Sequence, residues 1–256
     1  MLLEQRLEFI DSLPTLPVIT QRSLFSPAAF SEKPEHDTNN STASVMPDTI
    51  NAFLPGVPQE IIDDVNLCKL VMQNAANKRF DQDKQLFEWY RYYVDGLSKL
   101  GWVTQNTSMQ ETTIKRVGLT VDQVALEMTA GLIGSNAAQV LANVAKKAVE
   151  VVQKNPKPLE VFNSYAKLGR QPKFDIAPAW LDKNGQANMV LNCIVLDAKE
   201  STRGILFWKS TSQSTTIKTG AVRTYLDNKI FSGLRGDLYK RFSDSGKKFI
   251  EDLPDF

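Results

Sequence analysis

The chain has 256 residues, of which 42% are hydrophobic and 23% charged, with a formal net charge of +1 at pH 7. This apolar content suffices for a large core without disulfides or metals, and the near-neutral charge argues against general electrostatic binding to nucleic acid. Two cysteines, Cys68 and Cys193, are too few for a disulfide framework. The sequence is compatible with one disulfide bridge, two reduced thiols or a modified thiol.

Residues 1–13 predict a short amphipathic helix with Leu3, Leu7 and Ile10 on one face. Acidic residues stand where a secretory signal needs a basic start and an apolar run, so we expect no signal peptide. We therefore expect the protein in the cytoplasm of the producing cell, or at host membranes after release by a non-classical route.

Residues 31–49 (SEKPEHDTNNSTASVMPDT) are polar and rich in turn-forming residues, which predicts a linker or a mobile loop. The predicted organisation is thus an N-terminal helix and polar linker over residues 1–50. A single α/β domain follows over residues 51–256.

Residues 58–100 predict a helical hairpin. Pro58 suits a first turn, and an apolar stripe at helical spacing follows it, formed by Ile61, Val65, Cys68 and Met72. Asp81 is predicted to cap a second, aromatic helix that runs to about Leu100.

Residues 102–119 predict two short strands, and a helical block then runs to about Gln153 with a break or kink at Gly131 and Gly134. Within this block, residues 128–145 carry no charge. Their polar side chains and glycines argue against a permanent membrane span, which needs about 20 mostly apolar residues. Either this helix is buried between layers of a soluble domain, or it hides its apolar face and enters a membrane conditionally.

Three strand-like runs occupy residues 188–226, namely NMVLNCIVLDAK, RGILFWKSTS and STTIKTGAVRTYL, and a final helix is predicted from about Asp227. In the first run, alternation puts Leu191, Cys193 and Val195 on one face. Because both faces are apolar, this strand is predicted to be central and covered on both sides. Helices followed by a meander predict an α/β fold of the α+β type with an antiparallel sheet.

The sequence carries no catalytic signature. The single histidine, His36, lies in the polar segment, which removes most histidine-dependent triads and metal sites. There is no glycine-rich phosphate loop, CxxC pair or HExxH. Asp63 and Asp64 are a candidate acid–base pair, but a helix N-terminus favours acidic residues at this place. We therefore expect no catalytic residue and no metal site.

Each cysteine has two interpretations, an inert buried thiol or a thioester-linked fatty acid held in an apolar cavity. Cys193 lies on the predicted central strand, and Cys68 lies on the apolar stripe of a predicted helix. Both are therefore candidate lipid-attachment residues, with Cys193 the stronger of the two.

The order of elements, together with the hairpin RGILFWKSTSQSTTIKTGAVRTYL, resembles the cytolytic delta-endotoxins, in which an apolar-aromatic strand turns into a polar alternating one. The chain is also similar to the Erwinia virulence factor family, which shares that fold. The resemblance covers residues 55–252 by element order. It implies a three-layer Cyt-toxin-like fold with an antiparallel sheet wrapped by two helical layers, no enzyme activity, a palmitoyl group on a cysteine, and a role in the insect gut.

On this basis we expect a non-enzymatic bacterial virulence factor or toxin that acts at host membranes, with lipid or membrane as partner and oligomers on the membrane. One alternative is a soluble protein that binds a lipid or acyl chain without forming a pore. Another is an acyl-handling enzyme with a cysteine nucleophile, for which His36 is the only histidine available as a base. Residues 31–49 also offer a site for proteolytic activation.

Overall fold

The computed structural model describes residues 1–16, 39–81, 84–105, 109–114, 117–133, 135–156, 159, 162, 173–196 and 215–242. The helices are α1 (Leu3–Ser12), α2 (Gln59–Arg79), α3 (Leu86–Lys99), α4 (Val121–Ile133), α5 (Ser135–Lys154) and α7 (Asn228–Phe242). The strands are β1 (Thr42–Met46), β2 (Thr49–Phe53), β3 (Trp102–Gln105), β4 (Met109–Ile114), β5 (Lys173–Leu181), β6 (Ala187–Leu196) and β7 (Thr215–Leu226).

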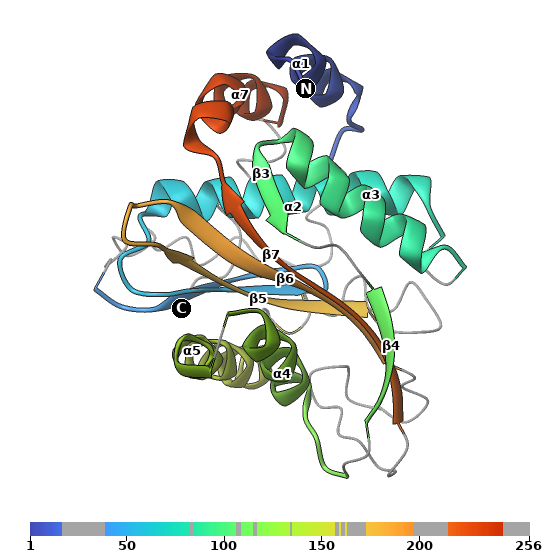
Figure 1. Ribbon diagram of the computed structural model, residues 1–256, viewed down its shortest axis with the longest axis vertical. Coiled ribbons are helices and arrows are strands. Elements are labelled where there is room, and N and C mark those ends of the chain that lie inside the picture. Colours follow the sequence, from blue (N-terminus) through green and yellow to red (C-terminus); the bar gives the residue numbers. More distant parts are fainter. Residues whose placement is uncertain are drawn as a thin grey trace.

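All described strands join one sheet, in the order β1-β2-β5-β6-β7-β3, and β4 also pairs with β7 (Figure 1). Strands β5, β6 and β7 form an antiparallel meander. Of the strands predicted over residues 188–226, β6 and β7 are confirmed and pair directly with one another. The pairing of β2 with β5 is parallel, so the sheet is mixed at this one junction and antiparallel elsewhere among the described pairs.

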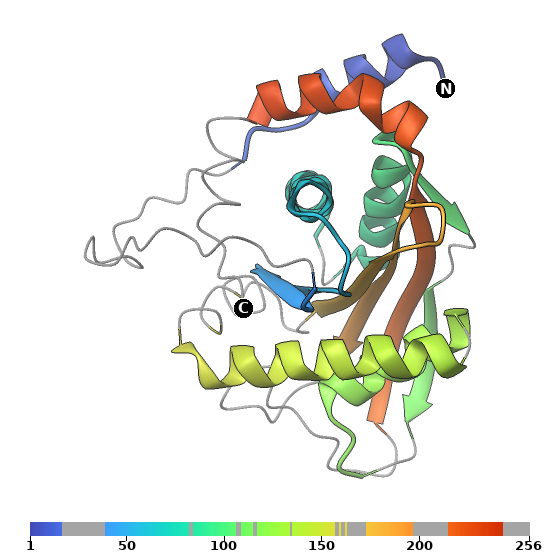
Figure 2. The same cartoon turned by 90° about the vertical axis from the view of Figure 1, so that its left-hand side faces the viewer.

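Helices cover both faces of this sheet. Helices α2 and α3 pack on one face and α4 and α5 on the other, while α1 and α7 form a further tier outside α2 (Figure 2). The predicted fold class, a sheet between two helical layers, is therefore confirmed. Two apolar cores result, one on each side of the sheet.

Strand β6 is central and covered on both faces, as predicted. Leu191, Cys193 and Val195 belong to the core under α2 and α3, whereas Ile194 belongs to the core under α4 and α5. The side-chain alternation of an extended strand therefore assigns Cys193 to the α3 side of the sheet.

The prediction of a linker over residues 31–49 is wrong for residues 42–49, which form β1, a turn and the start of β2. Ala43 to Met46 are all buried. The polar residues that suggested solvent exposure instead make hydrogen bonds inside the protein, as Ser44 does with Asn66. Residues 31–38, and His36 with them, lie outside the described residues.

Most other predicted elements are confirmed, with shifted ends. Helix α3 starts at Leu86 and not near Asp81, because a turn closed by the Gln85 N–H and the Asp81 carbonyl comes first. The helical block is two helices that meet between Ile133 and Ser135. The expected strand at RGILFWKSTS falls outside the described residues.

Among the described residues, none of the helices combines the length and apolar character that a membrane crossing requires. The uncharged stretch 128–145 is divided between the end of α4 and the start of α5.

Helices α2 and α3 approach closely at Gly96, where a Cβ atom would lie 1.9 Å from Cε of the buried Met72. We predict that Gly96→Ala lowers the free energy of unfolding by about 1–3 kcal/mol, because the end of the Met72 side chain must shift within a fully buried core to make space for the added methyl group. Denaturant unfolding measures this. Gly236→Ala on α7 is the control, since nothing lies within 4 Å of its added Cβ, and we expect it to be neutral or slightly stabilising. A neutral Gly96→Ala would contradict the close packing.

Candidate functional site

Helix α2 is buried on all sides, with every residue from Asp64 to Ala76 inaccessible to solvent. Its apolar residues belong to the core that also includes residues of α1, α3 and α7. Its remaining face is polar. Asn66, Lys69 and Gln73, at helical spacing, turn this polar face toward the sheet. A buried polar face needs partners for every group, since an unpaired group in the core is costly.

The centre of this polar face is an ion pair between Lys69 and Asp175. Lys69 Nζ lies 2.7 Å from Asp175 Oδ2, and the two side chains are 0% and 9% exposed. Lys69 also donates to Asn51 Oδ1 at 2.5 Å, and Asp175 Oδ1 accepts the backbone N–H of Asn192 at 2.9 Å. The carboxylate thus joins α2, β5 and β6, and the extra hydrogen bonds offset the cost of burying both charges.

The network extends from Lys69 to the first two strands. Asn51 donates to Asn66 Oδ1 at 2.8 Å, and Asn66 donates to Ser44 Oγ at 2.9 Å. One turn farther along α2, Gln73 Nε2 donates to Asp48 Oδ1 at 3.0 Å and to Thr49 Oγ1 at 2.7 Å. Helix α2 is therefore hydrogen-bonded to β1, β2 and β5.

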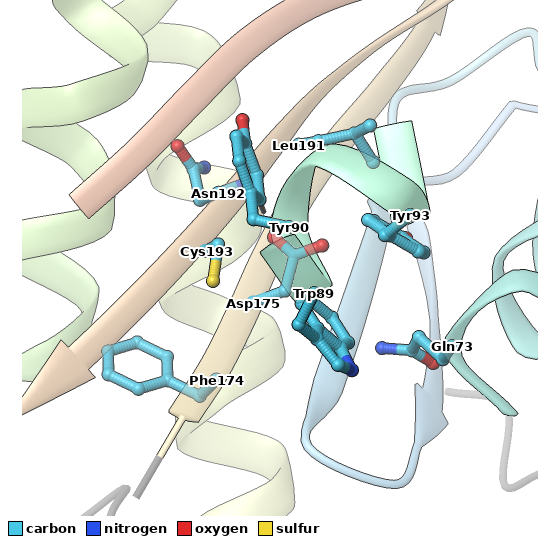
Figure 3. A pocket seen from close by; sticks show the side chains of 9 residues that line it. All are labelled: Gln73, Trp89, Tyr90, Tyr93, Phe174, Asp175, Leu191, Asn192 and Cys193. Carbon is cyan, nitrogen blue, oxygen red and sulfur yellow. Dashed lines mark hydrogen bonds between the residues drawn. The ribbon is translucent and has the colours of Figure 1, made fainter. Parts of the chain in front are cut away.

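A small cavity lies beside this network, between α3 and the sheet (Figure 3). Trp89, Tyr90 and Tyr93 line it from α3, and Leu191, Asn192 and Cys193 line it from β6. The centre of a water-sized sphere can occupy about 10 Å³ of this cavity. This is room for roughly one water molecule.

Cys193, the stronger candidate for lipid attachment, lies in the wall of this cavity and is 5% exposed. The Tyr90 ring covers the neighbouring strand, where a Cβ on Gly220 would lie 2.8 Å from Tyr90 Cζ. Gly220 pairs with Cys193 across the sheet. Each water-sized group of a palmitoyl chain takes roughly 30 Å³, so the whole chain needs a cavity volume of several hundred Å³. A lipid on Cys193 would therefore require Tyr90 to move away from Gly220.

Cys68, the weaker candidate, is fully buried on α2 and is not among the described residues that line the cavity. Burial raises the pKa of its thiol, which keeps the sulfur protonated and unreactive. No disulfide joins the two cysteines.

Asp64, the second residue of the candidate acid–base pair Asp63 and Asp64, has a structural role. Asp64 Oδ1 accepts hydrogen bonds from Arg235 Nε and from the Tyr239 hydroxyl, both at 2.9 Å, which fastens α7 to α2. Burial raises the pKa of Asp64 to about 7, against the opposing effect of the Tyr239 hydrogen bond.

Within the described residues, no group of three or more His, Cys, Asp or Glu side chains could hold a metal ion.

The residues that organise this site were not predicted from the sequence. Asp175 and Asn192 interrupt apolar strands, and the polar stripe on α2 breaks an otherwise buried pattern. A polar residue inside a strand covered on both faces is a signal that it has a buried partner, but the partner cannot be named without the fold.

Comparisons with known proteins show only a remote likeness. No family model and no curated protein matches the chain. A solved structure described as a delta-endotoxin matches with a TM-score of 0.40 and 12% identity, covering 85% of this chain and 96% of that one. The structure of the Evf virulence factor matches with a TM-score of 0.29 and 11% identity, covering 81% and 84%. At these values the likeness concerns the fold and carries no argument about function.

We predict that Lys69→Met lowers the free energy of unfolding by about 3–5 kcal/mol, because it leaves the Asp175 carboxylate buried without a counter-charge. Denaturant unfolding monitored by circular dichroism measures the loss. Combining Lys69→Met with Asp175→Asn removes that charge and should recover part of the stability.

Lys78→Met on the same helix is the matched control, because Lys78 is exposed. It should change the free energy of unfolding by less than about 1 kcal/mol. Equal losses for the two lysine variants would show that the buried pair has no special role.

Proposed function

We propose that this chain is a non-enzymatic virulence factor or toxin that engages host membranes by releasing the α4–α5 layer from its sheet. The observation that supports this proposal is the unequal attachment of the two helical layers. Among the described residues, one layer is held by a buried ion pair and several short hydrogen bonds, and the other mainly by apolar contacts.

The α2 side resists separation. Moving α2 from the sheet would break the Lys69–Asp175 ion pair and separate its two buried charges. It would also break the hydrogen bonds of Asn66 and Gln73 to β1 and to the turn before β2. The cost of an unpaired buried charge makes this layer the fixed part of the molecule.

The α4–α5 side is attached differently. Its described buried residues are mainly small and apolar, namely Val121, Val124, Ala125, Val144, Ala145, Ala148, Val149 and Val152. The hydrogen bond described between this layer and the sheet runs from Asn192 Nδ2 to Thr129 Oγ1 and measures 3.3 Å. Contacts of this kind depend on exclusion of water, and a lipid phase can replace them.

The place where α4 meets α5 is suited to enter lipid first. The uncharged residues 128–145 lie around this junction, while Lys146, Lys147 and Glu150 come later on α5. The uncharged start of α5 is about 15 Å long at 1.5 Å per residue. This is about half of a hydrocarbon core roughly 30 Å thick, so the helix pair would reach into one leaflet.

Release would also uncover the apolar sheet face beneath the layer, which includes Val45, Ile50, Phe174, Ile176 and Ile194. Apolar area that moves from water into lipid gains roughly 25 cal/mol per Å². We propose a host membrane, such as that of an insect gut, as the target, with oligomers forming on its surface.

The second candidate function is a soluble protein that carries an acyl chain on Cys193 without forming a pore. It is favoured by the position of this thiol in the wall of a cavity. The two functions differ in their effect on vesicles loaded with dye, since a carrier binds lipid without releasing the dye.

We predict that Val140→Glu weakens binding to phosphatidylcholine vesicles by at least roughly tenfold, because a buried charge in lipid costs about 2 kcal/mol or more. Val140 lies on α5 and is 54% exposed, so the change should leave the fold intact. Vesicle co-sedimentation and dye release measure the effect.

Val117→Glu is the control, because Val117 is 61% exposed and precedes α4 at the end away from the junction. It should bind vesicles as the unaltered protein does. Equal binding of all three proteins would rule out entry through the α4–α5 junction.

The second candidate function predicts that intact protein from its native host carries the added mass of one palmitoyl group, and that Cys193→Ser loses this mass while Cys68→Ser keeps it. Intact-mass spectrometry before and after hydroxylamine treatment, which cleaves thioesters, makes the measurement. An unmodified mass from the native host would remove the lipid-attachment hypothesis, although membrane entry through α4–α5 would still stand.

A further inference from the structure

The backbone ladder between β5 and β6 is interrupted in its middle. Lys173 and Phe174 pair with β6 at one end of the ladder, and residues 179–181 pair at the other. Between these ends, the Asn192 N–H donates to the Asp175 carboxylate at 2.9 Å, and Asn192 Nδ2 donates to the Ile176 carbonyl at 2.8 Å. Side chains therefore replace backbone partners along this stretch of the two strands.

The cavity described above lies at this interruption. Its walls include Phe174 and Asp175 from β5 and Asn192 and Cys193 from β6, which are residues of the interrupted stretch or next to it. Helix α3 covers it with aromatic rings. The interruption of the ladder therefore borders a cavity with room for about one water molecule.

Polar atoms without partners gather around this space. Among the described residues, five buried side-chain nitrogen or oxygen atoms have no hydrogen-bond partner. Four of the five belong to residues that line the cavity, namely Gln73 Oε1, Tyr90 Oη, Tyr93 Oη and Asn192 Oδ1. Buried polar groups are nearly always paired, so this gathering indicates a partner that is not a protein side chain.

The four atoms form a mixed set of donors and acceptors. Burial raises the pKa of both tyrosine hydroxyls, so each stays protonated and can donate. Both amide oxygens can only accept, and the Gln73 nitrogen already donates to Asp48 and Thr49. The Asn192 amide points toward α4, where Nδ2 donates to Thr129 Oγ1, so Gln73 Oε1 is the acceptor on the α3 side. A molecule that both accepts and donates hydrogen bonds, and is no larger than water, matches this set.

We infer that the cavity binds an internal water molecule that accepts a hydrogen bond from the Tyr90 hydroxyl. The Tyr93 hydroxyl and Gln73 Oε1 are the further unpaired groups on the α3 side of the sheet. The inference is independent of the proposed membrane entry, and a lipid on Cys193 in the same cavity would exclude it.

The sign of the stability change in Tyr90→Phe tests this inference. With a bound water, the variant loses a hydrogen bond, and its melting temperature should fall by about 2–4 °C. With no water, the variant removes an unpaired buried hydroxyl, and its melting temperature should rise. Tyr92→Phe is the control on the same helix, because Tyr92 is half-buried and outside the cavity wall; it should shift by less than about 1 °C.

A crystal structure of the full chain provides the second measurement. It should show one isolated density peak about 2.7–2.8 Å from Tyr90 Oη. A higher melting temperature for Tyr90→Phe, no density in the cavity, or elongated density joined to Cys193 Sγ would each overturn the water site. Dye release from vesicles addresses the proposed function separately, so the two can fail independently.

Discussion

The Lys69–Asp175 ion pair is the interaction on which this structure depends. A lysine and an aspartate buried at a 2.7 Å separation are tolerated only because Asn51 and the Asn192 backbone supply further hydrogen bonds. That requirement fixes the position of α2 over β5 and draws β6 toward the same carboxylate. It also explains why a helix can be buried on all sides while carrying polar residues along one face.

The same constraint makes the molecule asymmetric. Its sheet has a polar, firmly hydrogen-bonded junction with α2 and an apolar junction with α4 and α5. Apolar contacts are non-directional and can be exchanged for lipid, whereas a buried ion pair cannot be separated without a large cost. The proposed membrane entry rests on this difference, because it requires one sheet face to be uncovered while the other layer stays in place.

The sequence predicted much of the fold and little of the site. Apolar periodicity located α2, the two-helix block and α7, and strand alternation placed Cys193 on a strand covered on both faces. The error at residues 42–49 and the omission of Lys69 have one cause. Polar residues in a sequence suggest solvent, and only the fold shows that Ser44, Asn51 and Asp175 meet in the core. Pairings between segments more than a hundred residues apart have no local sequence signal.

Hydrogen–deuterium exchange of the chain with and without phosphatidylcholine vesicles tests the central claim most directly. The account predicts that amide exchange in α4, α5 and the strands beneath them changes when vesicles are added. Amides of α2 should stay as protected as in solution, because the Lys69–Asp175 pair holds that layer in place. Loss of protection in α2 before α4 and α5, or a uniform change along the chain, would contradict the account.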